Sequence, residues 1–367
     1  MYKMKKMAAL LLSSILTVSL VACGDSKEPD DSGKTATENG GQNAGEQGGT
    51  LDEVTIVLPR PAECLDDVDF VVADEVGYFE KNGIKVTFEV ASGTSDMTMV
   101  SMGQGDVCFP DPDVFLLGKE SNLDIVSFYQ RDTIVSNVLI VKEDSSIQSL
   151  QDIAGCKIAV GDASWSACID PVLLAAGVDP STVEYVVAGE DRAQMVVSGK
   201  VDAAFSWEKG YQLWQAQGLA IRPISFYDQV KMLGNPLVTT KDNVENNKDL
   251  LQRFCRAMAE AEYFVTCNPD AAAQIVMKRF PSIDVEHDVA VEVVNAAIKL
   301  WSSGEGFDEH GYGYVPDEIW ENCISYAKEA GIIENDYTAD DCYTDVFIEY
   351  ANDFDKDAVK ADAENYK

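Results

Sequence analysis

Apolar and polar positions follow two different periods between residues 51 and 240 of the chain. The run VTIVLP (54–59) indicates a buried strand, and IKVTFEVAS (84–92) alternates with the period of two that is typical of a half-buried strand. Between them, DFVVADEVGYFEKNG (69–83) predicts one helix that ends at Gly83. Similar alternation continues to residue 226, which predicts an α/β fold with mainly parallel sheets flanked by helices.

The pattern changes after NPLVTT (235–240), where strand-like runs stop and amphipathic helices follow. KDLLQRFCRAMAEAEYFVTC (248–267) is the longest of these helices and carries one apolar stripe. The stripe consists of Leu250, Leu251, Phe254, Cys255, Met258, Ala261 and Phe264. The sequence therefore predicts a helical C-terminal part.

The first 50 residues have no pattern of a folded domain. Residues 1–22 combine three lysines with an uncharged apolar run, as secretory signal peptides do, and end in LVAC, which looks like a bacterial lipobox with Cys23 as the lipidated residue. Residues 23–50 lack aromatic side chains and read as a lipidated cysteine followed by a disordered tether. The sequence predicts an extracytoplasmic body anchored to a cell membrane by lipid, and an ordinary signal peptide cleaved near Ala22 is the alternative.

Charge narrows the range of partners. The chain has 28 Lys and Arg against 63 Asp and Glu, a formal net charge of −35 at pH 7. Such a surface repels phosphate backbones and anionic lipid headgroups, so nucleic-acid binding is not expected. A solvated acidic surface that keeps an exported protein soluble explains the same charge, which therefore does not identify a ligand.

Eight cysteines follow Cys23, and their spacing does not determine their state. No CxxC or His-Cys spacing of a zinc site occurs, so no metal is expected. Free thiols and one or more disulfides are both compatible with the sequence. The eight are Cys64, Cys108, Cys156, Cys168, Cys255, Cys267, Cys323 and Cys342.

Four segments carry a resemblance to a known family. They are VVADEVGYFEKNGIKVTFEVASGTS (71–95), MVSMGQGDVCF (99–109), SLQDIAGCKIAVG (149–161) and VVSGKVDAAFSWE (196–208). Their order and spacing resemble the solute-binding proteins of ABC importers, in the group that binds nitrate, sulfonates and taurine, and the pyrimidine precursor of thiamine. The resemblance extends over about residues 54–347, and DEIWENCISYAKEAGIIENDYTADDCYTDVFI (317–348) is similar, more loosely, to the pyrimidine-precursor branch.

The resemblance implies a two-lobe clamshell of the periplasmic-binding-protein type II, with ligand held between the lobes at the carboxyl ends of the strands. Lobe 1 would comprise residues 51–140 and 237–331, lobe 2 residues 141–236, and 332–367 a C-terminal helical tail. It also implies a monomer without a cofactor, which hands its small-molecule ligand to an ABC permease and its ATPase.

Loops after predicted strands supply candidate ligand contacts. PRPAECLDD (59–67) offers charges of both signs, and SGTSD (92–96) and GDASWSACIDP (161–171) each begin a helix, where backbone amides and hydroxyls hold carbonyl or anionic groups. Simple N-capping is the alternative function of the same hydroxyls. The candidates from these three loops are Arg60, Glu63, Ser92, Gly93, Thr94, Ser164, Trp165 and Ser166.

Aromatic and acidic residues indicate the class of ligand. Trp207 ends the predicted strand in DAAFSWEKGY, and together with Trp165 and Tyr129 it would form a stacking slot for a flat ring. Acids would accept hydrogen bonds from ring amino groups, although each aromatic is also compatible with core packing and each acid with solvation. An anionic ligand remains an alternative, because the sequence offers three arginines as partners, Arg60, Arg131 and Arg192. The candidates from this set are Asp111, Asp113, Tyr129, Trp165, Trp207, Glu208 and Tyr211.

Catalysis is not expected from these residues. The fold family also includes a thiamine-pyrimidine synthase, which depends on a cysteine-rich iron motif and a histidine consumed in the reaction. This sequence has no adjacent cysteines, and its two histidines, His287 and His310, lie in the helical C-terminal part. We expect a solute-binding protein for a thiamine-precursor-like heteroaromatic; a sulfonate, taurine or nitrate binder, a ligand-presenting sensor and a synthase-like enzyme are the alternatives.

Overall fold

The computed structural model describes residues 50–60, 65–91 and 95–366. The predicted signal peptide, Cys23 and the tether up to residue 49 lie outside the described residues. No helix in the described part of the chain is long and apolar enough to cross a membrane.

The first sheet has five strands in the order β2-β1-β3-β10-β4. β1 pairs in parallel with β2 and β3, whereas β10 runs antiparallel between β3 and β4. The strands are β1 (Asp52–Leu58), β2 (Ile84–Val90), β3 (Val107–Cys108), β4 (Val126–Tyr129) and β10 (Leu237–Thr239). β10 comes from a part of the sequence far from the other strands, so the chain leaves this sheet and returns to it.

The second sheet also has five strands, in the order β7-β6-β8-β5-β9. β6 pairs in parallel with β7 and β8, and β5 pairs antiparallel with β8 and β9. The strands are β5 (Asn137–Lys142), β6 (Lys157–Val160), β7 (Glu184–Val187), β8 (Ala203–Trp207) and β9 (Ile221–Ser225). The predicted α/β class is confirmed, and each sheet mixes parallel and antiparallel pairs. The limits predicted for the two lobes remain a prediction.

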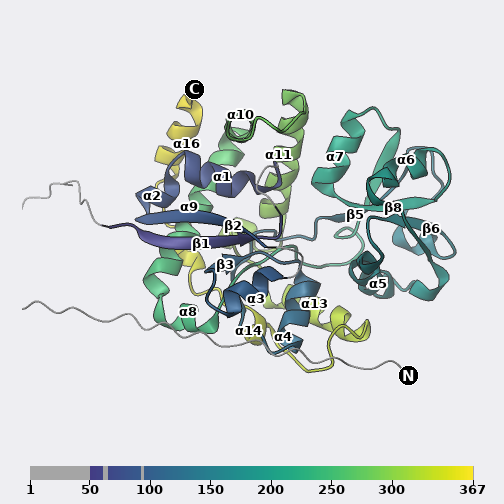
Figure 1. Cartoon of the computed structure of the whole chain (residues 1–367), viewed down its shortest axis with the longest axis horizontal. Helices are drawn as coiled ribbons and strands as arrows, with labels where there is room; N and C mark the ends of the chain where they lie inside the picture. Colours follow the sequence, from purple (N-terminus) through teal and green to yellow (C-terminus); the bar gives the residue numbers. More distant parts are fainter. Residues whose placement is uncertain (1–49, 61–64, 92–94, 367) are drawn as a thin grey trace, which may run out of the picture. The chain divides into compact units, whose positions relative to one another are not determined.

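Helices cover both faces of each sheet (Figure 1). The described residues after β10 contain helices and loops only, in agreement with the sequence pattern. The helices before β10 are α1 (Val68–Glu75), α2 (Tyr78–Lys81), α3 (Ser95–Ser101), α4 (Pro112–Glu120), α5 (Ser166–Ala175), α6 (Arg192–Val197) and α7 (Glu208–Ala216). Those after it are α8 (Lys241–Asn246), α9 (Lys248–Cys267), α10 (Pro269–Arg279), α11 (His287–Ser302), α12 (Phe307–His310), α13 (Asp317–Glu329), α14 (Ala339–Cys342), α15 (Ile348–Asn352) and α16 (Lys356–Asn365).

Five short 3-10 helices connect these elements, and one of them, η1, lies beside the candidate site described below. They are η1 (Leu65–Asp67), η2 (Leu150–Ile153), η3 (Ala163–Trp165), η4 (Pro180–Thr182) and η5 (Gly189–Asp191).

The period of two along β1 divides its side chains between two cores. Ile56 and Leu58 join the core formed with α1, α9, α10 and α11, and Val57 faces the opposite core with α3 and α4. The predicted stripe of α9 is buried in the first of these cores, with Leu250 at its edge. A third core fills the space between the second sheet and helices α6 and α7.

One predicted helix is divided in two. The structure has α1 and α2 where the sequence suggested a single helix over residues 69–83. Gly77 lies between them with φ of 90°, a left-handed conformation that residues other than glycine adopt with strain. The helical pattern of apolar residues continues across Gly77, so the break was not visible in the periodicity.

Two neighbouring segments connect the sheets, residues 130–136 after β4 and residues 226–236 before β10. They are hydrogen-bonded to one another, with 3.0 Å from Val135 N to Met232 O and 2.9 Å from Gly234 N to Asp132 O. A Cβ at Gly234 would lie 2.6 Å from the carbonyl oxygen of Ile134, so only glycine allows this approach. The paired segments bring polar side chains between the two sheets.

Candidate functional site

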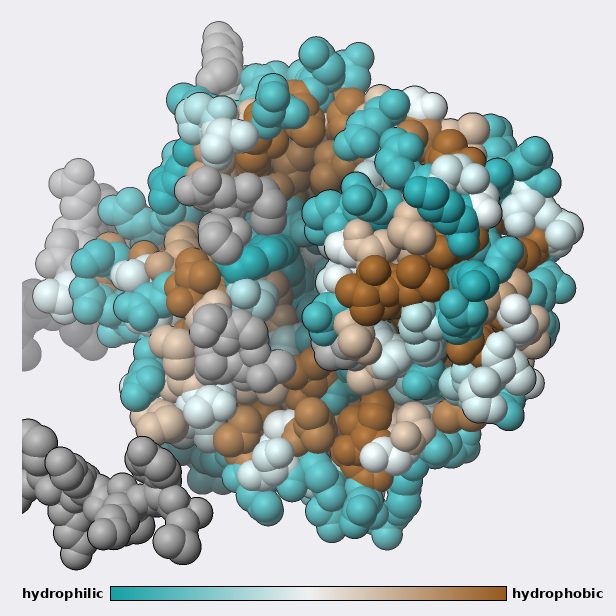
Figure 2. Space-filling view, turned by 45° about the vertical axis from the view of Figure 1, so that its right-hand side comes forward, coloured by the Kyte–Doolittle hydropathy of each residue, from teal (hydrophilic) through white to brown (hydrophobic). Residues whose placement is uncertain are grey.

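A cavity of about 300 Å³ lies between the two sheets, at the ends of strands from both. The surface in this region is hollowed, with polar residues deep in the hollow (Figure 2). Its size and position are those expected for a small-molecule site in an open α/β sheet. The lining residues are Pro59, Arg60, Asp66, Phe109, Asp111, Arg131, Asp132, Ser136, Asn137, Trp165, Cys168, Phe205, Trp207, Lys209 and Asn235.

Aromatic rings form the wall on the side of the second sheet. The ring centroids of Trp165 and Trp207 are 6.4 Å apart with an interplanar angle of 70°, and Trp165 contacts Phe205 edge-on at 5.7 Å. β8 carries Phe205 and Trp207, and Trp165 comes directly before α5. Phe109, which follows β3, adds one ring from the first sheet. These rings offer flat apolar contact to a planar ligand.

Arg192 holds Trp165 from behind. Its guanidinium carbon lies 4.8 Å from the centroid of the Trp165 ring, and its Nε donates to the carbonyl oxygen of Phe205 at 3.2 Å. Gly161 provides the space, because a Cβ there would lie 2.6 Å from the Trp165 ring. The buried arginine therefore orients the ring by a cation–π contact and does not reach the cavity.

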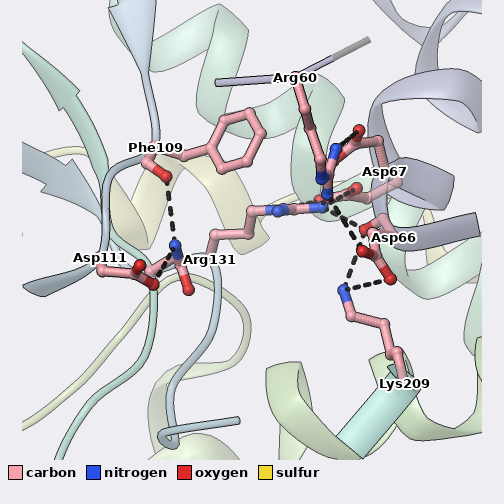
Figure 3. Close-up of polar contacts among 9 residues, drawn as sticks. Arg60, Asp66, Asp67, Phe109, Asp111, Arg131 and Lys209 are labelled. Carbon is pink, nitrogen blue, oxygen red and sulfur yellow. Dashed lines mark hydrogen bonds and ion pairs between the residues drawn. The ribbon is translucent and has the colours of Figure 1, made fainter. Parts of the chain in front are cut away.

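The cations of the opposite wall bind acids of η1 and α1 (Figure 3). Arg131 donates to both carboxylate oxygens of Asp69, at 2.5 and 2.7 Å, and Arg60 donates to Asp67 at 2.6 Å. Lys209 of α7 donates to the carbonyl oxygen of Asp66 at 3.0 Å. Arg131 and its partners are buried, so their pairing is weakly screened by solvent.

Acidic groups remain at the cavity. The Asn235 amide nitrogen donates to the carbonyl oxygen of Phe109 at 3.2 Å and to Asp111 Oδ1 at 3.1 Å (Figure 3). Burial by the surrounding protein raises the pKa of Asp111, against the hydrogen bond from Asn235 and the charge of Arg60. Burial likewise raises the pKa of Asp132, although Arg131 and Lys209 oppose it. Asp111 is exposed and screened by solvent, so Asp132 is the buried carboxyl group of this wall whose ionised form is only partly compensated.

Of the predicted site residues, the structure brings Arg60, Asp111, Trp165 and Trp207 together around this cavity. Asp113 lines a neighbouring cavity of about 30 Å³ instead, at the start of α4. Burial and the nearby charge of Asp111 raise the pKa of Asp113 to about 6, against a hydrogen bond from the Cys168 thiol.

Four predicted residues lie away from the cavity lining. Tyr129 is buried and donates to Glu262 at 2.5 Å, and Glu208 accepts from Lys299 of α11 at 3.1 Å. Tyr211 belongs to the core under the second sheet, and the Ser166 hydroxyl donates to a main-chain oxygen in its own loop at 3.1 Å. Helix α7 thus turns Glu208 and Tyr211 away from the cavity that Trp207 lines.

The other predicted residues cannot be placed. Glu63, Ser92, Gly93 and Thr94 lie outside the described residues, as does the side chain of Ser164. Cys23, the predicted lipidation site, lies outside them too. Seven of the other eight cysteines are described, and these seven are free thiols.

The prediction of site residues missed the polar side chains of the two connecting segments. Asp132, Ser136, Asn137 and Asn235 all lie in these segments or directly after them. In the sequence they belong to QRD (130–132), SN (136–137) and GNP (234–236), short polar groups beside buried strands. The reversal from one sheet to the other was the available signal, since a ligand cleft forms where two sheets meet.

Known proteins resemble this chain along most of its length. The riboflavin-binding protein RibY of Chloroflexus aurantiacus is 21% identical over 359 residues, 94% of this chain and 99% of that protein. The formylaminopyrimidine-binding protein of Halalkalibacterium halodurans is 22% identical over 292 residues, 75% of this chain and 84% of that protein. Enzymes match as well: the 4-amino-5-hydroxymethyl-2-methylpyrimidine phosphate synthase of Aspergillus parasiticus is 23% identical over 305 residues, 77% of this chain and 84% of the enzyme.

Solved structures share the fold. The crystal structure of a putative sulfonate-binding protein SsuA from Methylobacillus flagellatus superimposes with a TM-score of 0.59 at 18% identity, covering 82% of this chain and 94% of that one. The two five-stranded mixed sheets are therefore those of a periplasmic-binding-protein type II fold, as the resemblance implied. A profile described as NMT1/THI5 like matches residues 67–272, more than half of the chain. The chain belongs to the NMT1/THI5-like family.

Proposed function

We propose that this chain is a lipid-anchored, extracytoplasmic solute-binding protein of an ABC importer that captures a small heteroaromatic molecule of the thiamine-pyrimidine-precursor type. The observation that carries the proposal is the cavity between the sheets, with Trp165, Phe205 and Trp207 on one side and acidic groups on the other. A planar ring with amino groups matches both sides. Relatives named as binders of riboflavin and of formylaminopyrimidine agree with this class.

Capture would proceed by closure of the two lobes around the ligand. The paired connecting segments, 130–136 and 226–236, would act as the hinge, and ligand contacts from both sheets would favour the closed state. A permease and its ATPase would be the partners that recognise that state, and the binding protein would act as a monomer. Residues 1–23 support the membrane anchor, because a lysine-rich start and an apolar run precede the lipobox-like LVAC.

Sulfonate, taurine or nitrate binding is the first alternative, favoured by structural relatives such as the SsuA protein. An anion needs cationic donors at the site. Arg131 and Arg60 both donate to buried acids at 2.7 Å or less, so an anionic ligand would have to compete with these internal pairs.

An enzyme is the alternative from another class, favoured by the related synthases. His287 pairs with Asp270 at 2.7 Å and His310 stacks on Tyr314 at 3.9 Å. Neither histidine is among the described residues that line the cavity. A reaction that consumes a histidine would therefore find none in the described lining of this cavity.

A sensor that presents the ligand to a receptor is a further alternative. It would use the same closed form and would differ only in the partner protein.

Thermal unfolding of the full-length chain in detergent tests the binding function. The probes are 4-amino-5-hydroxymethyl-2-methylpyrimidine, riboflavin, taurine, an alkanesulfonate and nitrate, each at millimolar concentration. A probe at a hundredfold excess over its Kd adds about 2.7 kcal/mol to the unfolding free energy, enough to raise the midpoint by several degrees. We expect a shift with a heteroaromatic probe, and shifts with the anions alone would contradict the proposed ligand class.

A further inference from the structure

On the polar wall of the cavity, Arg131 and Asn235 direct donors to acceptors of the protein itself. Arg131 uses three donor contacts internally, two to Asp69 and one, at 2.7 Å, to the carbonyl oxygen of Asp66. Asn235 uses its amide nitrogen twice, on Phe109 O and Asp111 Oδ1. A carbonyl and a carboxylate can only accept, so the Asn235 nitrogen must face them, and its amide oxygen remains as a further acceptor.

Asp132 is a residue of the cavity lining with an acceptor atom that is unpaired within the described part of the chain. Its side chain is 3% exposed and lines the cavity, yet Oδ1 has no hydrogen-bond partner among the described residues. A buried carboxylate oxygen without a donor is unfavourable, because it has lost water and gained no hydrogen bond, and here the charges of Arg131 and Lys209 compensate only in part. The raised pKa of Asp132 expresses the same deficit.

The main chain holds Asp132 in place. Its N–H donates to the carbonyl oxygen of Asn235 at 3.1 Å, and its own carbonyl oxygen accepts from Gly234 N at 2.9 Å and from Gln130 Nε2 at 2.8 Å. The carboxyl group thus belongs to one of the two hydrogen-bonded segments that connect the sheets. A ligand that satisfies it would contact the proposed hinge directly.

We propose that Asp132 selects the ligand of this cavity by accepting hydrogen bonds from N–H groups on one edge of a flat, neutral or singly protonated heterocycle, with Asp111 as a second acceptor. The inference rests on the proposed binding function. It adds that Asp132 is the selecting residue and that the ligand donates the hydrogen bonds while the protein accepts them. Anions are disfavoured, because they would meet acidic groups where donors are needed. The rings of Phe109, Trp165 and Trp207 would contact the faces of the same heterocycle.

Isothermal titration calorimetry of the full-length chain in detergent tests this with two pairs of probes. One pair is 4-amino-5-hydroxymethyl-2-methylpyrimidine and its analogue without the 4-amino group; the other is riboflavin and 3-methylriboflavin, which lacks the ring N–H donor. For the pair that binds, we expect removal of the donor to weaken binding to the unchanged protein roughly ten- to hundredfold. Asp132→Leu removes both acceptor oxygens at similar side-chain size. This variant should bind the donor-bearing probe more weakly by a similar factor, and its affinities for the two members of the pair should become nearly equal.

The matched control is Asp124→Asn, an exposed acid before β4 and outside the cavity lining, which should bind as the unchanged protein does. Unfolding without ligand at pH 7 checks the fold of Asp132→Leu, whose midpoint should not fall, since the change removes a poorly compensated buried charge. If that variant misfolds, the comparison of the two probes on the unchanged protein still tests whether the cavity recognises the N–H donor of the ligand.

The outcomes separate the two proposals. Equal affinity of both members of the pair that binds, or undiminished binding by folded Asp132→Leu, overturns the role of Asp132 and leaves the binding function intact. Binding of an alkanesulfonate or nitrate in place of both heterocycles overturns the polarity of recognition. Absence of binding by every probe overturns the proposed function, and the inference with it.

Discussion

The two walls of the cavity differ in how they can hold a ligand. The second sheet contributes large rings, Trp165, Phe205 and Trp207, whose contacts depend on area and little on direction. The first sheet contributes charged groups that are mostly bound to one another, as Arg131 is to Asp69. The comparison suggests that the aromatic wall supplies affinity for planar molecules in general, whereas the acceptors of the polar wall decide which planar molecule is retained.

The polar wall also contains a buried ion pair, Arg131 with Asp69. Arg131 and Asp69 are 2% and 0% exposed, so removal of one partner leaves the other as an uncompensated buried charge. For this reason, the largest effect that we expect comes from the polar wall.

Arg131→Met should lower the free energy of unfolding by about 3–5 kcal/mol, because Asp69 would remain buried without its cation. Urea denaturation at pH 7, followed by tryptophan fluorescence, measures the change. The matched control is Lys85→Gln, which removes an exposed ion pair with Glu53 and should leave the unfolding free energy nearly unchanged, because solvent screens that pair. Similar losses from the two variants would show that the buried pair has no special role.

Trp207→Ala tests the aromatic wall. Removal of the ring should weaken binding of the heteroaromatic probe by roughly 1–3 kcal/mol if the ring stacks on the ligand. Trp207→Phe, which keeps a ring, should retain most of the affinity, and both affinities are measured by calorimetry. Unchanged affinity of a folded Ala variant would show that Trp207 does not contact the ligand. It would also contradict the idea that the aromatic wall supplies affinity for planar molecules.

Asp113→Asn tests whether the acid that lines the small neighbouring cavity destabilises the folded protein through its charge. Asp113 has a pKa of about 6 in the folded protein, above its ordinary value of 3.8, so ionisation disfavours the folded state. The penalty is small below about pH 4, grows as the pH rises from about 4 to about 6, and stays constant above that range. The Asn variant should match the unchanged protein at pH 4 and exceed its unfolding free energy by roughly 1–3 kcal/mol at pH 7.5.

Urea denaturation at both pH values measures this difference. A gain of equal size at pH 4 would mean that Asp113 destabilises the protein through its shape and not through its charge. Loss of stability at both values would mean that the hydrogen bond from the Cys168 thiol matters more than the buried charge.

Local periodicity predicted much of the fold. Alternation at residues 84–90 matches β2, the stripe of α9 is buried where expected, and the described residues after β10 contain no strand. These features depend on which face of one element is apolar, and a single sequence records that directly. Gly77 shows the limit, since the apolar pattern runs through it while its backbone interrupts the helix.

The candidate site was predicted less completely. The sequence suggested Trp165, Trp207, Arg60 and Asp111, which lie at or after the ends of strand-like runs, and the structure places all four around the cavity. Their contact with a ligand stays a prediction. The sequence also suggested Glu208 and Tyr211, which the tertiary structure turns toward α11 and the core of the second sheet. Periodicity reports that a residue is buried, whereas the group against which it is buried depends on elements far away in the chain.

The sequence alone thus determined the α/β class, the helical C-terminal part and the strand-end loops of this protein, because those follow from local patterns of apolar and polar residues. Only the tertiary structure decided which charges cancel one another and, among the described residues, which buried carboxylate oxygens lack a hydrogen-bond partner. Asp132 and Asn235 are separated by a whole sheet in the sequence, yet their main chains are hydrogen-bonded beside the cavity. Electrostatic compensation is a property of distances between such residues, and the folded chain alone sets those distances.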